Sequence, residues 1–295
     1  MATPLLGAIE AGGTKFVCAI GTGPDDLHAL ERFPTTTPAE TLQRAIAFFK
    51  QHDARIATLG IGSFGPIDPN PASPSYGHIT TTPKAHWSHT DFAGKMQRAL
   101  GCPVAFDTDV NAAARGEQRW GAAQDVGSAL YITVGTGIGG GFISHGRTLH
   151  GLVHPEMGHI RVPRHPDDPF PGRCPYHRDC LEGLASGPAL HDRWGQPGAD
   201  LSDDHPAWPI EAHYLGHAVA MLALVLSPER VILGGGVMHQ PQLLPLIRST
   251  VHDVLAGYVQ HASLLHDIDQ YIVAPGLGDR AGVLGALALA QTALV

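Results

Sequence analysis

The sequence predicts an α/β protein built from two related domains. Segments with the features of strands and segments with the features of helices alternate along the chain, which is typical of α/β folds. Two stretches, 5–20 and 128–144, begin alike, each with a strand, a glycine turn and a second strand. We therefore expect a first, smaller domain over 1–117 and a second, larger domain over 118–278. The remaining segment, 279–295, is a candidate for a final helix that packs back on the first domain.

Composition indicates a soluble globular protein. The 295 residues are 43% hydrophobic and 16% charged, and the net charge of −8 argues against a nucleic-acid-binding surface. The amino-terminal segment lacks the basic start of a signal peptide, and the longest apolar stretch, 218–226, is about half a membrane span. We expect a cytoplasmic protein that binds neither nucleic acid nor membrane. In that reducing compartment, its four cysteines favour metal binding or catalysis over disulfides.

The elements of the first half follow from local patterns. Residues 5–21 are two apolar runs around a Gly-Gly turn, which predicts a β-hairpin. Residues 37–52 predict a helix that Thr37 caps, with Pro38 in the first position and Glu40 completing a capping box. The stretch "RIATLGIGSFGPID" predicts a strand that runs into a glycine-proline loop. A further strand, "CPVAFDTD", leads into a helix, "VNAAARGEQRW".

The second half repeats this alternation after a new start. Residues 128–146 predict a second hairpin, and 150–180 are dense in His, Pro and Gly with little periodicity. The stretch "GHAVAMLALVLSP" predicts a helix, and "RVILGGGV" predicts a strand that ends in a glycine turn. A final helix is predicted by "DRAGVLGALALAQTAL".

Three glycine turns are candidates for nucleotide binding. "GTGIGG" matches the dinucleotide pattern, but no amphipathic helix follows it, and "EAGGTK" lacks the spacing of a Walker loop. Either turn alone is most simply a hairpin turn. Together, however, glycines that turn N–H groups outward, two threonine hydroxyls and a lysine could hold a polyphosphate, while the third turn, at 233–238, could receive a base. The candidate residues are Gly12, Gly13, Thr14, Lys15, Gly135, Thr136, Gly137, Gly234, Gly235 and Gly236.

Two carboxylates mark a strand-to-helix junction. In "FDTDVNAAARGE", Asp107 and Asp109 lie close to Asn111. An Asp in such a place often only caps the helix. A cap explains one carboxylate, whereas phosphoryl transfer needs a group that orients the attacking hydroxyl and accepts its proton. The junction is therefore a candidate catalytic site.

The segment "CPYHRDC" is a candidate metal loop. It lies in a region with five histidines, His150, His154, His159, His165 and His177. With His159 upstream, the loop offers two thiolates and two imidazoles, the donors of a structural zinc site. A disulfide between Cys174 and Cys180 is the alternative, and histidines can also be plain surface residues.

Seven motifs occur in a fixed order: "EAGGTK", "GSFGPID", "FDTDVNAAA", "GTGIGGG", "HPEMGH", "CPYHRDCLE" and "LGGGV". This order resembles the ROK family of sugar kinases and repressors, and most closely its bacterial fructokinase branch. The resemblance covers essentially the whole chain. It implies an actin-like, hexokinase-like (ribonuclease H-like) α/β fold, in which two domains close on ATP and a sugar bound in the cleft between them.

The resemblance also assigns residues. It implies that Asp109 is the catalytic base, and that Glu10 or Asp107 helps to hold Mg²⁺ through water, since hard cations prefer oxygen ligands. Glu10 and Thr108 stand where the family more often has Asp and Asn. The implied sugar contacts are Gly65, Pro66, Thr108, Asp109, Glu156, His159 and Glu182. The implied ligands of one structural Zn²⁺ per chain are His159, Cys174, His177 and Cys180.

The expected function is that of an ATP-dependent fructokinase acting as a homodimer. Such an enzyme transfers the γ-phosphoryl group of ATP to the 6-hydroxyl of D-fructose and forms fructose 6-phosphate. Glucose, mannose and N-acetylmannosamine are the alternative substrates. A sugar-responsive repressor would need an added DNA-binding region, for which few residues precede the first glycine turn. A sugar-binding protein without catalysis would not need Asp109. We expect loss of zinc to impair the sugar contacts more than the ATP contacts.

Overall fold

The computed structural model describes residues 3–52 and 55–294, which form two compact units. Unit 1 takes in 141–155, a segment that sequence analysis placed in the second domain, because side chains of this segment hydrogen-bond to elements of unit 1. Unit 1 consists of Met1–Gln124, Gly141–Pro155 and Asp279–Val295, and unit 2 of Asp125–Gly140 and Glu156–Gly278.

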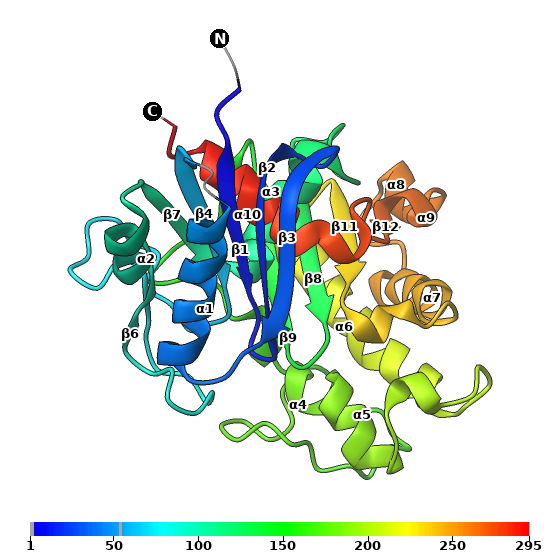
Figure 1. Cartoon of the computed structure of the whole chain (residues 1–295). Helices are drawn as coiled ribbons and strands as arrows, with labels where there is room; N and C mark the ends of the chain where they lie inside the picture. Colours follow the sequence, from blue (N-terminus) through cyan, green and yellow to red (C-terminus); the bar gives the residue numbers. More distant parts are fainter. Residues whose placement is uncertain (1–2, 53–54, 295) are drawn as a thin grey trace. The chain divides into compact units, whose positions relative to one another are not determined.

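Unit 1 is built on a five-stranded sheet (Figure 1). Its strands are β1 (Leu6–Ala11), β2 (Lys15–Gly23), β3 (Asp26–Pro34), β4 (Thr58–Ser63) and β7 (Val104–Thr108). Their order is β3-β2-β1-β4-β7. The first three strands pair antiparallel, so the predicted first hairpin is confirmed, and β1, β4 and β7 pair parallel. The carboxyl ends of β4 and β7 therefore meet at one edge, where the sequence places its Gly-Pro loop and its two carboxylates.

Three helices of unit 1 begin within two residues of the starts that the sequence predicts, and a fourth, over 92–100, was not predicted. They are α1 (Pro38–Gln51), α2 (Phe92–Leu100), α3 (Asp109–Trp120) and α10 (Ala281–Gln291), and a small hairpin joins β5 (His78–Ile79) to β6 (Thr90–Asp91). The Thr37 hydroxyl accepts a hydrogen bond from the Glu40 N–H, at 3.4 Å. Hydrogen bonds from Thr36 and Thr37 in turn lower the pKa of the Glu40 carboxyl. The predicted capping box is thus confirmed.

Glycines bring α10 into backbone contact with its neighbours in unit 1. A Cβ atom on Gly285 of α10 would lie 2.0 Å from the Ala112 carbonyl oxygen of α3. A Cβ atom on Gly60 of β4 would lie 1.9 Å from the Ala286 carbonyl oxygen. Only residues without a side chain fit at such distances. The final helix is consequently part of the core of unit 1, as Figure 1 shows for α3 and α10.

A second five-stranded sheet runs through unit 2. Its strands are β8 (Ser128–Val134), β9 (Ile138–Ser144), β10 (Arg147–Thr148), β11 (Arg230–Gly234) and β12 (Ile272–Val273), in the order β10-β9-β8-β11-β12. β8, β11 and β12 pair parallel, and the predicted second hairpin is β8 and β9. The last residues of β9 and all of β10 belong to unit 1 by their contacts.

The helices of unit 2 follow an irregular stretch. They are α4 (Leu181–Ala185), α5 (Gly187–Trp194), α6 (Ala207–Leu226), α7 (Leu243–Leu255), α8 (Ala262–Leu265) and α9 (Ile268–Tyr271). The stretch 149–180, all of it described, contains one 3-10 turn, η1 (Met157–His159), as the lack of periodicity predicts.

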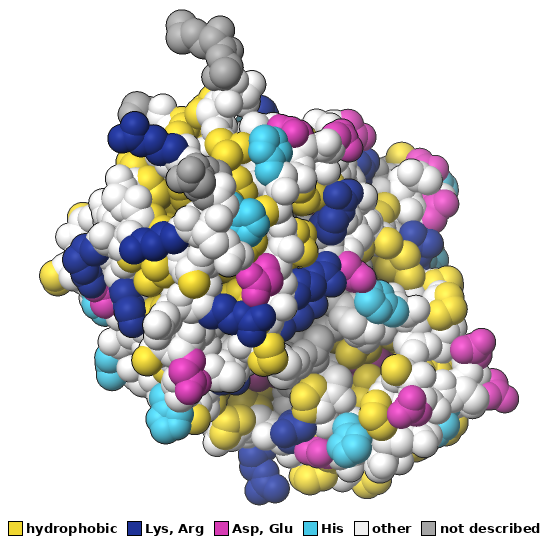
Figure 2. All heavy atoms as spheres, viewed as in Figure 1, with side chains coloured by type: hydrophobic (Ala, Val, Ile, Leu, Met, Phe, Trp, Pro, Cys, Tyr) yellow, Lys and Arg dark blue, Asp and Glu magenta, His cyan; other side chains and the backbone are white. Residues whose placement is uncertain are grey.

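Helix α6 is the one described helix that is long and apolar enough to cross a membrane. Of its most apolar window, 61% is buried inside the structure, and its Glu211 is completely buried. The helix is therefore a core element of unit 2. On the face that Figure 2 shows, basic, acidic and histidine side chains are interspersed over the surface.

Candidate functional site

The strand-to-helix corner of unit 1 holds Asp109. β7 ends at Thr108, and Asp109 is the first residue of α3. The hydroxyl of Thr108 accepts the hydrogen bond from the Asn111 N–H at 3.1 Å, so the N-cap is Thr108. The interpretation of Asp109 as the cap is thereby wrong. Thr108, predicted as a sugar contact, is buried, and its hydroxyl serves the helix.

Asp107 is the centre of a buried hydrogen-bond network in unit 1. One of its oxygens, Oδ1, accepts from the Thr108 N–H at 2.8 Å, from Asn111 Nδ2 at 2.8 Å and from His150 Nε2 at 3.0 Å. The other, Oδ2, accepts from the Thr148 hydroxyl at 2.9 Å. Burial raises the pKa of Asp107, but the hydrogen bonds lower it more, and the net shift is downward. Asp107 is therefore an ionised carboxylate with both oxygens engaged.

The Gly-Pro loop lies next to a second histidine in unit 1. The Gly65–Pro66 peptide bond is cis, and the following N–H, of Ile67, donates to His154 Nε2 at 3.0 Å. A Cβ atom on Gly65 would lie 3.2 Å from the His154 ring. The ring of His154 thus accepts a hydrogen bond as a neutral imidazole and fixes the loop that carries two of the predicted sugar contacts.

The first glycine turn joins β1 to β2. The Gly12 N–H donates to the Lys15 carbonyl at 2.9 Å, and the Gly12 carbonyl accepts from the Thr35 hydroxyl at 2.7 Å. Among the described residues other than Gly13 and its two chain neighbours, none has a heavy atom within 4 Å of a Cβ atom built on Gly13. Lys15 is exposed. The turn is therefore anchored at Gly12 and open at Gly13, next to a cation.

Glu10 precedes this turn, and its carboxyl reaches the start of α10. It accepts a hydrogen bond from the Val283 N–H, and a Cβ atom on Gly282 would lie 2.5 Å from its Cδ. Burial raises the pKa of Glu10, and the charges of Lys15 and Arg32 partly offset that rise. No side chain of α10's own N-terminal residues caps the helix. Glu10 supplies this cap across 273 residues of sequence, and the longer side chain of Glu compared with Asp suits that reach.

The second glycine turn, in unit 2, is held by residues that follow the metal loop. The Gly135 carbonyl accepts from the Gly187 N–H at 2.8 Å, and the Ile138 N–H donates to Glu182 Oε2 at 3.0 Å. A Cβ atom on Gly137 would lie 2.6 Å from the same oxygen. Thr136 is the middle one of the three residues that connect β8 to β9. A predicted sugar contact, Glu182, is thus hydrogen-bonded directly to a predicted phosphate loop.

The third glycine turn follows β11. Gly234 ends the strand, and a Cβ atom there would lie 2.6 Å from the Tyr131 hydroxyl. Gly235 has a φ of 92° and packs against the backbone of Val134, so a side chain is excluded on both grounds. Gly236 starts a 3-10 turn, and nothing lies within 4 Å of a Cβ atom built on it.

One carboxylate of unit 2, Glu156, has a raised pKa. Burial, and then the negative charge of Glu182, raise the pKa of Glu156 to about 7. Glu156 precedes η1, whose Gly158 would place a Cβ atom 1.8 Å from the Ile138 carbonyl oxygen. The turn that carries Glu156 and His159 therefore packs against the start of β9, which also receives Glu182.

Four predicted zinc ligands come together in unit 2. The donor atoms of His159, Cys174, His177 and Cys180 all lie within 4.8 Å of one another. His159 Nδ1 is 3.5 Å from Cys180 Sγ and 3.8 Å from Cys174 Sγ, and Cys174 Sγ is 3.7 Å from His177 Nδ1. Around a tetrahedral Zn²⁺, the usual metal–ligand bond lengths place nitrogen and sulfur about 3.6 Å apart. The cysteines are free thiols, and the four side chains fit a zinc ion in composition and spacing.

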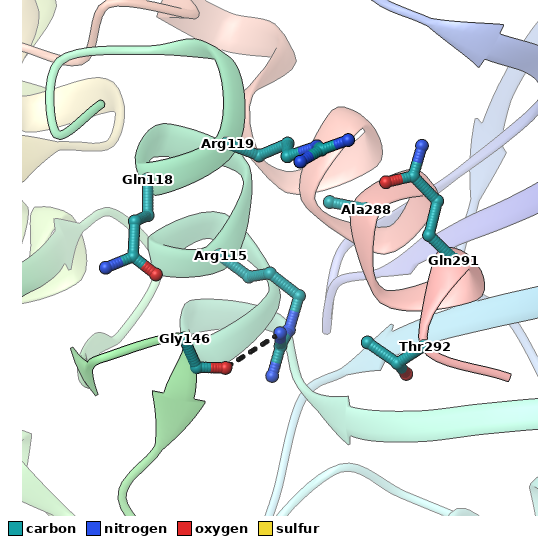
Figure 3. Close-up of a pocket in the computed structure, with 7 residues that line it drawn as sticks. All are labelled: Arg115, Gln118, Arg119, Gly146, Ala288, Gln291 and Thr292. Carbon is teal, nitrogen blue, oxygen red and sulfur yellow. Dashed lines mark hydrogen bonds between the residues drawn. The ribbon is translucent and has the colours of Figure 1, made fainter. Parts of the chain in front are cut away.

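Figure 3 shows a pocket of unit 1 that contains none of the predicted site residues. It lies between α3 and α10, and its volume is about 380 Å³. In it, Arg115 Nη1 donates to the Gly146 carbonyl at 3.2 Å. The lining residues are Arg115, Gln118, Arg119, Gly146, Ala288, Gln291 and Thr292.

Comparison with known proteins identifies the family. Residues 6–293 match the ROK family. The chain belongs to the ROK family. A ROK family glucokinase from Streptomyces griseus, solved in complex with glucose and AMPPNP, has 27% sequence identity to it and a TM-score of 0.78, with 98% of this chain and 99% of that one covered. The two-domain α/β fold of actin-like sugar kinases, predicted from the sequence, is thereby confirmed.

Two curated relatives of this ROK protein are named fructokinase. The one from Pediococcus pentosaceus is 47% identical over 290 residues, which is 98% of this chain and 99% of the relative. The one from Zymomonas mobilis is 46% identical over 296 residues, covering 98% of this chain and 97% of the relative.

Sequence reasoning missed two hydrogen-bond partners of Asp107 in unit 1. Thr148 and His150 both donate to Asp107, from a segment about forty residues further along the chain. His150 was noted only as one of five histidines. The sequence offers no spacing signal for such a contact, because the partners belong to different elements.

Proposed function

We propose that this chain is an ATP-dependent fructokinase that phosphorylates the 6-hydroxyl of D-fructose. The observation that carries the proposal is the corner at Asp109. There an acidic residue follows a buried, hydrogen-bonded strand end, and the helix is capped by its neighbour Thr108 instead. The fructokinase names of relatives at 47% and 46% identity support fructose as the sugar.

In the proposed reaction, Asp109 accepts the proton of the 6-hydroxyl as its oxygen bonds to the γ-phosphorus of ATP. The bond from that phosphorus to the bridging oxygen breaks, and ADP leaves. The glycine turns offer N–H groups to the phosphates, with Lys15 as a cation beside Gly13. Magnesium, when bound, neutralises phosphate charge. Glu10 caps α10, and both oxygens of Asp107 accept hydrogen bonds. We therefore assign Mg²⁺ to the ATP phosphates and not to these two carboxylates.

We propose that Glu156, His159 and Glu182 hold sugar hydroxyls and that the four-residue cluster binds one structural Zn²⁺. His159 faces the cysteines through Nδ1, which leaves Nε2 for the sugar. The cluster has four nitrogen and sulfur donors, so a bound zinc would have a closed coordination sphere and a structural role. The homodimer and the cytoplasmic location expected from the sequence stay predictions.

A panel of hexoses, with Mg²⁺ and ATP and with ADP release as the readout, tests the sugar. We expect kcat/KM to be higher for fructose than for glucose, mannose or N-acetylmannosamine, and the product to be fructose 6-phosphate by NMR. A value for glucose equal to or above that for fructose would assign another ROK hexose kinase. No sugar-dependent ADP release at all would overturn the proposal of a sugar kinase.

A further inference from the structure

The segment 146–154 of unit 1, which we name the strap, is tied to the elements around Asp109. At its start, the Gly146 carbonyl accepts from Arg115 of α3 at 3.2 Å. At its end, His154 accepts from the N–H of Ile67 in the Gly-Pro loop at 3.0 Å. Between these points, Thr148 and His150 donate to Asp107. The strap therefore links three parts of unit 1: the end of β7, helix α3 and the Gly-Pro loop.

Apolar packing does not hold the middle of the strap. Leu152 is fully exposed, at 102%, and Val153 is 50% exposed. The position of the strap thus depends on its hydrogen bonds, and those to Asp107 are made to a carboxylate that is only 3% exposed. Hydrogen bonds to a buried charged acceptor are stronger and more directional than those between neutral groups on the surface.

Asp107 transmits this constraint to both sides of Asp109. Its Oδ1 accepts from the N–H of Thr108, immediately before Asp109, and from the side chain of Asn111, two residues after it. Thr108 and Asn111 are also hydrogen-bonded to each other across Asp109. The orientation of the Asp107 carboxylate therefore fixes the position of the backbone on both sides of Asp109. That orientation is held from the outside by the donors Thr148 and His150.

We propose that His150 is a positioning residue for the base: it holds the Asp107 carboxylate in the orientation that aims Asp109 at the sugar hydroxyl. The inference rests on the proposed function. His150 donates through Nε2, because a carboxylate can only accept. In this role the side chain of His150, which is 35% exposed, acts on Asp109 through its hydrogen bond to Asp107.

Two substitutions separate the donated hydrogen bond from the shape of the ring. His150→Phe keeps a flat ring and removes the donor, and we expect kcat to fall about tenfold to a hundredfold, since small errors in placing a reacting group have effects of that size. The KM values for fructose and ATP should stay close to those of the wild type. His150→Gln offers an amide N–H near the position of Nε2 and should restore most of the lost kcat.

The decisive measurement repeats His150→Phe in an Asp109→Asn background. If His150 acts by positioning Asp109, its loss should cost nothing further once the base is gone, because residues that act as a unit are non-additive. The same fold-loss in both backgrounds would overturn the inference, as would a wild-type kcat in His150→Phe. A large rise in the sugar KM at unchanged kcat would also overturn it.

The chain offers a matched control in the same unit. His28 Nε2 lies 3.0 Å from Asp26 Oδ1, the same contact at the same distance, but with both side chains more than half exposed. His28→Phe should leave kcat unchanged. A wild type without kinase activity would overturn the proposed function and the inference with it. An active wild type with a fully active His150→Phe variant would overturn the inference alone.

Discussion

At the start of α3, Thr108 caps the helix, and its neighbour Asp109 is the proposed general base. The Thr108 hydroxyl bonds the Asn111 N–H, so the cap of α3 survives changes at the next residue. Thr is among the residues that cap helices well. A substitution at Asp109 should therefore change the chemistry of the site and leave the helix intact.

Asp109→Asn should lower kcat by about 10²- to 10⁴-fold, the usual contribution of a general base. Thermal stability and the fructose Kd should stay near those of the wild type, because the amide has the same shape and Thr108 still caps the helix. Steady-state kinetics and calorimetry measure the two effects. Asp91→Asn is the control, since Asp91 is the cap of α2 and Asn can replace it there. A variant with more than about a tenth of wild-type kcat would exclude the base role.

At the scale of residues, the sequence predicts those contacts that form between residues close together in the chain. Thr37 and Glu40 lie three residues apart, and their capping box is visible as a pattern and confirmed in the structure. Glu10 and Val283 make a comparable cap from opposite ends of the chain. No local pattern reports that contact, or the one between Asp107 and His150. These pairings depend on which strand ends meet, which only the folded sheet decides.

At the scale of elements, short helix α4 connects three parts of unit 2. Cys180, one of the four clustered ligand candidates, is its N-cap residue. Glu182, in its first turn, accepts the Ile138 N–H, and the following helix begins with Gly187, which donates to Gly135. A change in the metal loop can thus reach the second glycine turn through either of two hydrogen bonds, from Ile138 to Glu182 and from Gly187 to Gly135. We still expect loss of zinc to impair the sugar contacts more than the ATP contacts.

Cys174→Ser should lower the melting temperature and the zinc content together, since four ligands are needed for a closed structural site. Because α4 carries Glu182, the KM for fructose should rise, and the KM for ATP should rise by a smaller factor. Elemental analysis, thermal unfolding and kinetics check these effects.

Cys102→Ser, at a buried thiol of unit 1, is the control and should keep the zinc. We expect about one zinc per chain in protein purified without added metal. Wild-type protein without zinc and with a Cys174–Cys180 disulfide in non-reducing mass spectrometry would contradict the metal site.

At the scale of the whole molecule, stability depends on charges buried in the core of unit 2. Asp168 accepts from Arg193 and from the Tyr214 hydroxyl, so both of its oxygens have donors, whereas Nη1 of Arg193 has no hydrogen-bond partner among the described residues. Glu211 of α6 is completely buried, and neither of its oxygens has a hydrogen-bond partner among the described residues. Burial raises the pKa of Glu211 well above its ordinary value of 4.5, and the charge of Arg193 only partly opposes this. The folded protein therefore keeps a proton that the unfolded chain loses.

This proton makes stability fall as the pH rises. Above the ordinary pKa of 4.5, unfolding releases the Glu211 proton, so its stabilising effect is complete below that pH and is lost toward the raised native pKa. One such group contributes a slope of at most about 1.4 kcal/mol per pH unit. Urea unfolding should therefore show that the free energy of unfolding of Glu211→Gln, relative to that of the wild type, is higher at pH 8 than at pH 5.

Other titrating groups cancel in this comparison because both proteins contain them. Asp125→Asn, in the same unit, is the control: the hydrogen bond from Arg230 lowers the pKa of the Asp125 carboxyl, so this variant should not become more stable relative to the wild type as the pH rises. An unchanged difference between Glu211→Gln and the wild type at the two pH values would show that Glu211 is already ionised in the folded state.

The place of α10 in unit 1 has a consequence for the order in which the protein is made. Gly60 of β4 and Gly116 of α3 leave room for α10 at backbone contact, yet α10 follows every other described helix in the sequence. Every residue of unit 2 is synthesised before it. Although domains generally fold as units while the chain is still being synthesised, unit 1 must wait on the ribosome with one side of its core uncovered. Unit 2, although its sequence starts later, is the first that can finish folding.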